Sequence, residues 1–199
     1  MAIVCSNCGR QYDVTLFQFG KTINCACGAR VGFENRIVLP REVELRFFAD
    51  VMLHRLVRWL RALGIDTIWE DRIADSELVR RALEEHRWVL TLDKRISEEW
   101  RVGNVFLLKS EKTFEQLNEV AKHFNLKISD QIFKRCLVCN TLLQSPSEEE
   151  IIASELPENV RANQRDFQFC PACRKIYWQG SHTERMRNAL KKILKRETE

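Results

Sequence analysis

The chain has 199 residues, 45% of them hydrophobic and 30% charged, which is the composition of a globular protein rather than a disordered one. A formal net charge of +4 is too small to indicate an anionic partner unless the charges cluster. No apolar run approaches the roughly 18 residues of a membrane helix, and the N-terminus shows no secretory signal. These features exclude disordered and membrane-spanning classes, and we expect a cytoplasmic protein.

The first predicted unit, residues 1–40, carries four cysteines in two close pairs. Cys5 and Cys8 lie in CSNCG, and Cys25 and Cys27 lie in CACG. Close pairing without a secretory signal favours a metal site over disulfides, and four thiolates suit tetrahedral zinc. The second pair has one residue between its cysteines, where a zinc knuckle usually has two. The glycine after each pair still fits a tight turn, so we predict a structural zinc ribbon.

Residues 41–130 alternate short apolar strands with amphipathic helices. Strands are predicted at 45–49, 66–69, 87–92 and 104–109, and helices at 51–63, 75–86, 96–100 and 113–124. Helices that recur between strands indicate βαβ units. The sequence therefore predicts an α/β fold with a parallel sheet and helices on both faces.

Two strands of this sheet are followed directly by an aspartate. Asp50 follows the first strand in RFFADVML, and Asp93 follows the third in VLTLDKR. Ligand sites of open parallel sheets lie beyond the carboxyl ends of the strands. The two aspartates share one cleft if the third strand lies beside the first, which predicts the strand order 2-1-3-4. Asp75, at the start of the second helix, can reach the same rim.

Neighbouring carboxylates repel each other unless a cation neutralises them. Mg²⁺ and Mn²⁺ prefer carboxylate and water oxygens, and such ions support hydrolysis of phosphodiesters. Each aspartate also has a second interpretation, as the N-cap of the helix that follows it. These alternatives apply to Asp50 before residue 51, to Asp75 before SELV and to Asp93 before the short third helix.

Residues 131–199 contain a second cysteine group and a basic tail. Cys136 and Cys139 lie in CLVC, and Cys170 and Cys173 lie in CPAC. Two intervening residues in each pair predict a second structural zinc, and a closed four-thiolate site leaves no open position for catalysis. The insert between the pairs contains SPSEEE (145–150), which predicts an exposed acidic helix start. The basic tail, from RMRNALKKILKR onward, is a clearer nucleic-acid footprint than the net charge.

Several basic and aromatic residues are candidate RNA contacts. Lys94 and Arg95 adjoin Asp93. Arg55, Arg58 and Arg61 recur at intervals of three in the first helix, and either track a phosphate backbone or form a solvated face. Tyr177 and Trp178 either stack on bases or cover the ribbon core, and His182 is either a substrate contact or a hydrogen-bonded structural residue.

Together these motifs resemble the Mut-seven C-terminal ribonuclease domain family, which belongs to the PIN-like nucleases. The segments RFFADVMLHRLVRWLRALGIDT, DRIADSELVRRALEEHRWVLTLDKR, RCLVCN, FCPAC and YWQGSH carry the resemblance, over about residues 45–190. The resemblance implies a metal-dependent ribonuclease of PIN-like fold, here preceded by an extra zinc ribbon. Position by position, the acidic residues of the family match Asp50, Asp75 and Asp93, with Thr91 opening the threonine-x-aspartate motif.

Two positions depart from the family pattern. His54 stands where the family has glycine, and Leu92 where it has arginine; Glu98 is the nearest candidate for a fourth acidic residue. The leading hypothesis is a ribonuclease that uses Mg²⁺ or Mn²⁺ and acts on single-stranded RNA. Its expected substrate contacts are Thr91, Lys94, Arg95, Arg55, Arg58 and His182. The alternatives are a non-catalytic RNA-binding zinc-ribbon protein with a silent nuclease domain, or an adaptor for a protein partner.

Overall fold

The computed structural model describes residues 2–33, 37–40 and 44–195, and the chain forms two compact units. One unit comprises Met1–His54 and Ile68–Ser110, and the other comprises Arg55–Thr67 and Glu111–Glu199. The three predicted domains, 1–40, 41–130 and 131–199, stay a prediction, and residues 41–43 at the first boundary lie outside the described part. None of the described helices is long and apolar enough to cross a membrane.

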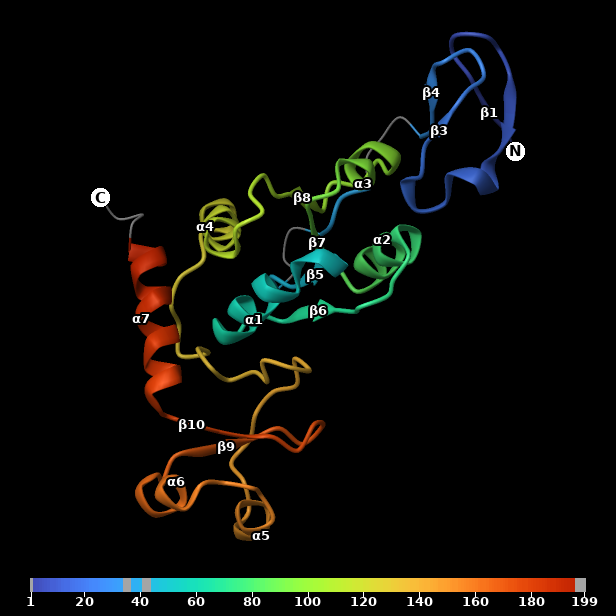
Figure 1. Ribbon diagram of the computed structural model, residues 1–199. Helices are drawn as coiled ribbons and strands as arrows, with labels where there is room; N and C mark the ends of the chain where they lie inside the picture. Colours follow the sequence, from blue (N-terminus) through green and yellow to red (C-terminus); the bar gives the residue numbers. More distant parts are fainter. Residues whose placement is uncertain (1, 34–36, 41–43, 196–199) are drawn as a thin grey trace. The chain divides into compact units, whose positions relative to one another are not determined.

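A four-stranded sheet forms the centre of the α/β region (Figure 1). Its strands are β5 (Phe47–Ala49), β6 (Thr67–Trp69), β7 (Trp88–Thr91) and β8 (Val105–Leu107), in the order β6-β5-β7-β8. β5 pairs in parallel with β7, and β7 with β8. All three residues of β5 are fully buried, as in a central strand of a sheet covered on both faces. The predicted α/β class and the order 2-1-3-4 are confirmed.

The helices begin and end close to the predicted residues. They are α1 (His54–Ala62), which follows the 3₁₀ turn η2 (Val51–Leu53), then α2 (Asp75–Glu84), α3 (Lys94–Glu99) and α4 (Thr113–Phe124). Leu78, Val79 and Ala82 form the buried stripe of α2, which packs against Phe48 of β5 and Val89 of β7. α3 begins two residues earlier than predicted because Asp93 caps it.

The N-terminal ribbon consists of two short hairpins. β1 (Ala2–Val4) pairs with β2 (Gln11–Asp13), and β3 (Ile23–Asn24) pairs with β4 (Arg30–Val31), with the 3₁₀ segment η1 (Val14–Gly20) between them. The buried core contains only Cys5, Phe17, Cys25 and Val31 among the described residues. A core of this size needs a staple such as a metal ion.

Hydrogen bonds join this ribbon to the end of α3. The Thr22 amide and hydroxyl both donate to the Glu99 carbonyl, at 2.5 and 3.0 Å. The Arg101 amide donates to the Gly20 carbonyl at 2.6 Å, and the Lys21 ammonium lies 5.3 Å from the centre of the Trp100 ring. The ribbon is therefore part of the same compact unit as the strand ends that carry Asp50 and Asp93.

The C-terminal ribbon is built on one hairpin and is followed by a long helix. β9 (Phe167–Phe169) pairs antiparallel with β10 (Ile176–Trp178), and α7 (Ser181–Lys195) follows (Figure 1). The insert forms α5 (Glu148–Ile152) and α6 (Glu158–Asn163). α5 begins with a capping box between Ser147 and Glu150, which confirms the predicted acidic helix start. The last basic residue of the tail, Arg196, lies outside the described residues.

Arg61 does not lie on an exposed face with Arg55 and Arg58, so that expectation was wrong. Residues three apart drift by about 60° around a helix, and by Arg61 the side chain has turned inward. It is 4% exposed, and its guanidinium donates to the Thr67 carbonyl at 2.9 Å and the Val138 carbonyl at 2.6 Å. Arg61 thus joins α1 to the CLVC knuckle.

Truncating Arg61 should destabilise the fold. Arg61→Ala leaves buried carbonyls without donors, so we expect the free energy of unfolding to fall by about 2–4 kcal/mol in chemical denaturation. Arg55→Ala, on the exposed side of the same helix, is the matched control and should change it by less than about 0.5 kcal/mol. Equal effects of the two variants would contradict the structural role of Arg61.

Candidate active site and metal centres

Asp50 and Asp93 are tied together at the carboxyl ends of β5 and β7. The Thr91 hydroxyl donates to Asp50 Oδ2 at 2.6 Å and accepts the Asp93 amide at 2.9 Å. The other Asp50 oxygen accepts the Val51 amide at 2.6 Å, and Asp50 is only 5% exposed. Because Thr91 is fully buried, its hydroxyl acts inside the protein, where it orients Asp50.

The N-cap interpretation holds for two of the three aspartates. Asp50 caps η2, and Asp93 caps α3 by accepting the Arg95 amide at 2.8 Å. Asp75 is not a cap, because Ala74 occupies that position and Asp75 is the first residue of α2. Within the described chain, the half-buried Asp75 carboxylate has no hydrogen-bond partner. Helix capping therefore does not explain Asp75.

The charges around Asp75 place it beside the other carboxylates. Burial raises the pKa of Asp75, and the negative charges of Asp50, Asp93 and Glu99 raise it further, against the opposing charge of Arg95. A half-buried carboxylate without a hydrogen bond, among like charges, fits a cation.

The acidic side chains are more widely spaced than the cysteines. Among the described residues, three or more ligand atoms within 4.8 Å of one another occur only in the two cysteine groups. Mg²⁺ keeps several of its waters and takes one or two carboxylates directly, so it does not require three ligand atoms this close together.

Arg95 forms an ion pair with Asp93. Its Nε and Nη2 donate to Asp93 Oδ2 at 2.9 and 2.6 Å, and these bonds, with the Arg95 amide, lower the pKa of Asp93. The Arg95 side chain is 72% exposed, so it can turn away without disturbing the core. The neighbouring Lys94 is exposed.

The acidic residue that the sequence interpretation missed is Glu99. Glu98, the earlier candidate, is exposed, whereas Glu99 is half-buried and its charge acts on both Asp75 and Arg95. Arg95 and Glu99 are four residues apart in α3 and so share a helix face, a spacing that could have identified Glu99 from the sequence.

The remaining candidate residues lie in different environments. His54 is exposed, with its ring centre 6.3 Å from that of Trp69. Leu92 is half-buried, and nothing in the structure explains its presence in place of arginine. Arg55 is exposed on α1, while Arg58 and His182 line one cavity of the second unit.

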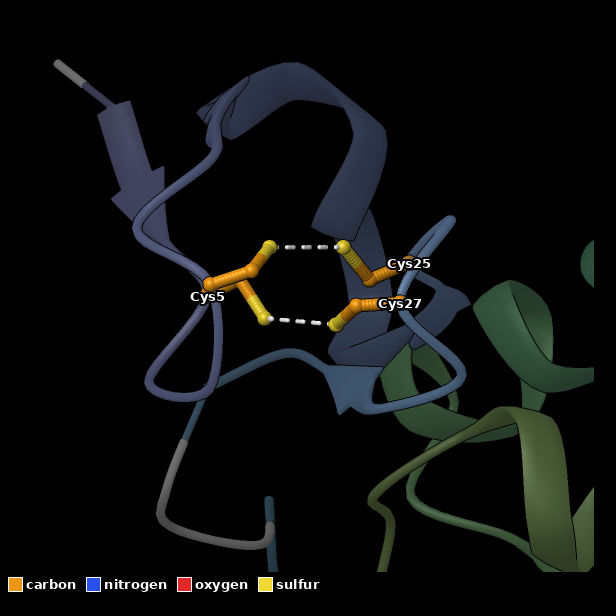
Figure 2. A group of neighbouring side chains, drawn as sticks. Cys5, Cys25 and Cys27 are labelled. Carbon is orange, nitrogen blue, oxygen red and sulfur yellow. Dashed lines mark hydrogen bonds between the residues drawn. The ribbon is translucent and has the colours of Figure 1, made fainter.

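Each cysteine group brings its four sulfurs within 4.8 Å of one another. Figure 2 shows Cys5, Cys25 and Cys27 pointing toward a common centre. The closest pairs are Cys5–Cys27 at 3.7 Å, Cys8–Cys25 at 3.4 Å, Cys136–Cys173 at 3.4 Å and Cys139–Cys170 at 3.3 Å. These distances exceed the roughly 2.05 Å of a disulfide and approach the edge of a zinc–thiolate tetrahedron, about 3.8 Å for a Zn–S bond of 2.3 Å. Both groups fit structural zinc.

All four cysteine pairs close with the same kind of turn. A residue in the left-handed region donates its amide to the carbonyl of the first cysteine; these residues are Gly9, Gly28, Asn140 and Arg174. In CACG the turn is one residue shorter, yet the Gly28 amide still reaches the Cys25 carbonyl at 2.8 Å. The Cys27 amide and the Tyr12 hydroxyl lower the pKa of Cys25 to about 6. The unusual spacing therefore retains the zinc-binding turn.

Metal analysis of the purified protein should find two zinc ions per chain, one for each cysteine group. Because each ribbon depends on four thiolates, Cys27→Ser and Cys139→Ser should each reduce the zinc content toward one per chain and lower the melting temperature. Retention of two zinc ions by Cys27→Ser would rule out the N-terminal site.

Removing the charge of Asp75 should stabilise the protein when no divalent ion is added. The pKa of Asp75 is higher in the folded state than in the unfolded state, so protonation of Asp75 at acidic pH favours folding. This contribution to the free energy of unfolding is lost as pH rises through the folded-state pKa. Asp75→Asn should therefore raise the melting temperature by roughly 1–3 °C near pH 7.5, and by less near pH 5.

The same variant should respond to Mg²⁺ in the opposite direction. Added Mg²⁺ should stabilise the wild type more than Asp75→Asn, because the variant has lost a negative oxygen facing the cation. Asp71→Asn removes an exposed carboxylate four residues earlier and should show neither effect. Equal Mg²⁺ stabilisation of wild type and Asp75→Asn would exclude Asp75 from a cation site.

Comparison with protein families gives one match. The family described as the Mut7-C RNAse domain matches residues 45–190, which include the acidic strand ends and the C-terminal ribbon but not the N-terminal one. Neither the curated proteins nor the solved structures contain a match to this chain. The family match covers well over half of the chain and confirms the resemblance inferred from the motifs. This protein belongs to the Mut7-C RNase domain family.

Proposed function

We propose that this protein is a metal-dependent ribonuclease that hydrolyses RNA at the acidic site formed by Asp50, Asp75 and Asp93. The observation that carries the proposal is the environment of Asp75, a half-buried carboxylate without a hydrogen bond among like charges. In an RNA-binding protein with a silent nuclease domain, the repulsion between Asp75 and the neighbouring carboxylates would serve no function. A cation bound between the carboxylates would replace this repulsion by attraction. Membership of an RNase domain family supports RNA as the substrate.

The three aspartates have different roles in this proposal. Thr91 and the Val51 amide hold Asp50 in one orientation, so its carboxylate is a fixed ligand. Asp75 is unrestrained by hydrogen bonds and can adjust to the cation. A bound Mg²⁺ or Mn²⁺ would supply Lewis-acid stabilisation of the phosphate and a more acidic water.

Arg95 and Lys94 provide positive charge beside the aspartates. A cation bound to Asp93 would displace the Arg95 side chain from it. The planar guanidinium of Arg95 would then be free to bind the scissile phosphate through two hydrogen bonds. Glu99 shares the face of α3 with Arg95 and adds negative charge to the site. Zinc in the two ribbons is structural in this scheme, because four thiolates leave no open position.

Cleavage of labelled single-stranded RNA with Mg²⁺ or Mn²⁺ tests the proposal. Asp50→Asn and Asp93→Asn should each lower the cleavage rate by roughly 100-fold or more, because each removes a charge aimed at the reacting phosphate. Asp71→Asn is the matched control and should cleave like the wild type. Unchanged zinc content and circular dichroism should establish that the variants are folded. If wild type and variants bind RNA equally and none cleaves it, the protein is an RNA-binding module.

A further inference from the structure

A cavity of about 250 Å³ lies on the second unit, and the residues that line it come from α1, the C-terminal ribbon and α7. Leu137, Leu143 and Met186 supply apolar walls, and Tyr177 and Trp178 supply aromatic ones. The cavity is smaller than the roughly 300–1,000 Å³ of sites for drug-sized ligands. Its size and walls suit a single planar ring system.

One face of the β9–β10 hairpin supplies the polar side of this cavity. Side chains alternate along a strand, so Asp166 and Gln168 share a face on one strand, and Lys175, Tyr177 and Gln179 share it on the other. The pairing of Tyr177 with Gln168 places both sets on the same side of the hairpin. All five of these residues line the cavity.

Three charged side chains of the cavity lining have no partners of their own. Among the described residues, the side chains of Arg58, Lys175 and Asp166 make no hydrogen bond or ion pair. By contrast, Arg135 in the same lining donates to the carbonyls of Gly64 and Asn140 and serves the fold. The unpartnered charges are available to a ligand.

The two opposite charges on the hairpin do not neutralise each other because they lie at opposite ends of it. Asp166 precedes β9, and Lys175 precedes β10. In this antiparallel register the two positions lie four residues apart along the hairpin, about 13 Å. The cavity therefore has a cationic end, near Lys175, and an anionic end, near Asp166. A fitting ligand carries negative charge at one end and hydrogen-bond donors at the other.

A nucleotide has this distribution of charge and donors. Its phosphate suits the unpartnered cations, and its base can lie against the aromatic and apolar walls. Asp166 accepts hydrogen bonds only, so it favours bases with an exocyclic amine, which offers two N–H donors where uracil offers only its ring N3–H. An acidic peptide suits the cations but would bring carboxylates toward Asp166.

We propose that this cavity binds one nucleotide of RNA whose base carries an exocyclic amine. The proposal rests on RNA being the substrate, as proposed above, but not on the acidic site being catalytically active.

Fluorescence polarisation with labelled single-stranded RNA, without added divalent ions, tests the cationic end of the cavity. Lys175→Ala removes one phosphate contact, so the slope of log affinity against log salt should flatten by about 0.7. Arg58→Ala combined with Lys175→Ala should weaken binding by roughly tenfold. Lys127→Ala removes an exposed lysine that lies outside both the cavity lining and the basic tail, and it should leave the slope unchanged.

The anionic end is tested by base preference. Wild type should bind oligocytidine more tightly than oligouridine of equal length, and Asp166→Asn should lose this preference while retaining its zinc. Equal binding of the two by wild type, equal salt slopes for Lys175→Ala and Lys127→Ala, or tighter binding of a polyglutamate peptide than of RNA would each overturn the proposal.

Failure of this proposal is distinguishable from failure of the ribonuclease proposal. Asp50→Asn should abolish cleavage but leave the base preference and the salt slope intact. A protein that shows this binding pattern but never cleaves RNA retains the nucleotide site and lacks the enzyme activity. If cleavage depends on Asp50 but the salt slope does not depend on Lys175, the protein is a ribonuclease that lacks the proposed nucleotide site.

Discussion

The parallel pairing of β5 with β7 is the constraint on which the acidic site depends. Parallel strands end at the same edge of a sheet, so residues that directly follow them become neighbours even when they are far apart in the chain. Asp50 and Asp93 meet in this way, and the buried hydroxyl of Thr91 bonds to both of them. Because β5 is fully buried and β7 is buried from Val89 to Thr91, this edge cannot shift without disturbing the core.

The two zinc ribbons share their turns but have different surroundings. In the first unit, hydrogen bonds from Thr22 join the N-terminal ribbon to the end of α3. The start of the same helix is capped by Asp93, so α3 is held at both ends, and Arg95 and Glu99 are presented from a fixed element. In the second unit, Arg61 bonds to the CLVC knuckle, and the hairpin of the C-terminal ribbon forms one side of a cavity.

Burial and local hydrogen bonding give identical side chains different roles. Arg61 is buried and saturates carbonyls, whereas Arg58, one turn earlier on the same helix, is exposed in a cavity lining. Asp50 is satisfied by two donors, whereas Asp75 has none and is opposed by its neighbours. Among the described residues, the fold thus leaves the side chains of Arg58 and Asp75 without hydrogen-bond partners.

The sequence by itself determined the features that depend on local patterns. Apolar strands alternating with amphipathic helices specified the α/β class, and the aspartates at two strand ends required the order in which those strands lie. Cysteine spacing specified both metal centres, and even the short CACG turn keeps the expected geometry. The acidic start of α5 was likewise predicted from SPSEEE, which contains Ser147 and Glu150 of the capping box.

Only the tertiary structure decided which charges are compensated. Ala74 rather than Asp75 is the N-cap residue of α2 because the helix begins at Asp75 itself. That Arg61 turns inward, and that Glu99 rather than Glu98 is half-buried, depends on rotation about a helix axis by a fraction of a turn. The cavity beside β9 and β10 likewise depends on strand register and on α1, which is distant in sequence. Local sequence patterns specify which elements form, but the neighbours of each side chain are set by the packing of those elements.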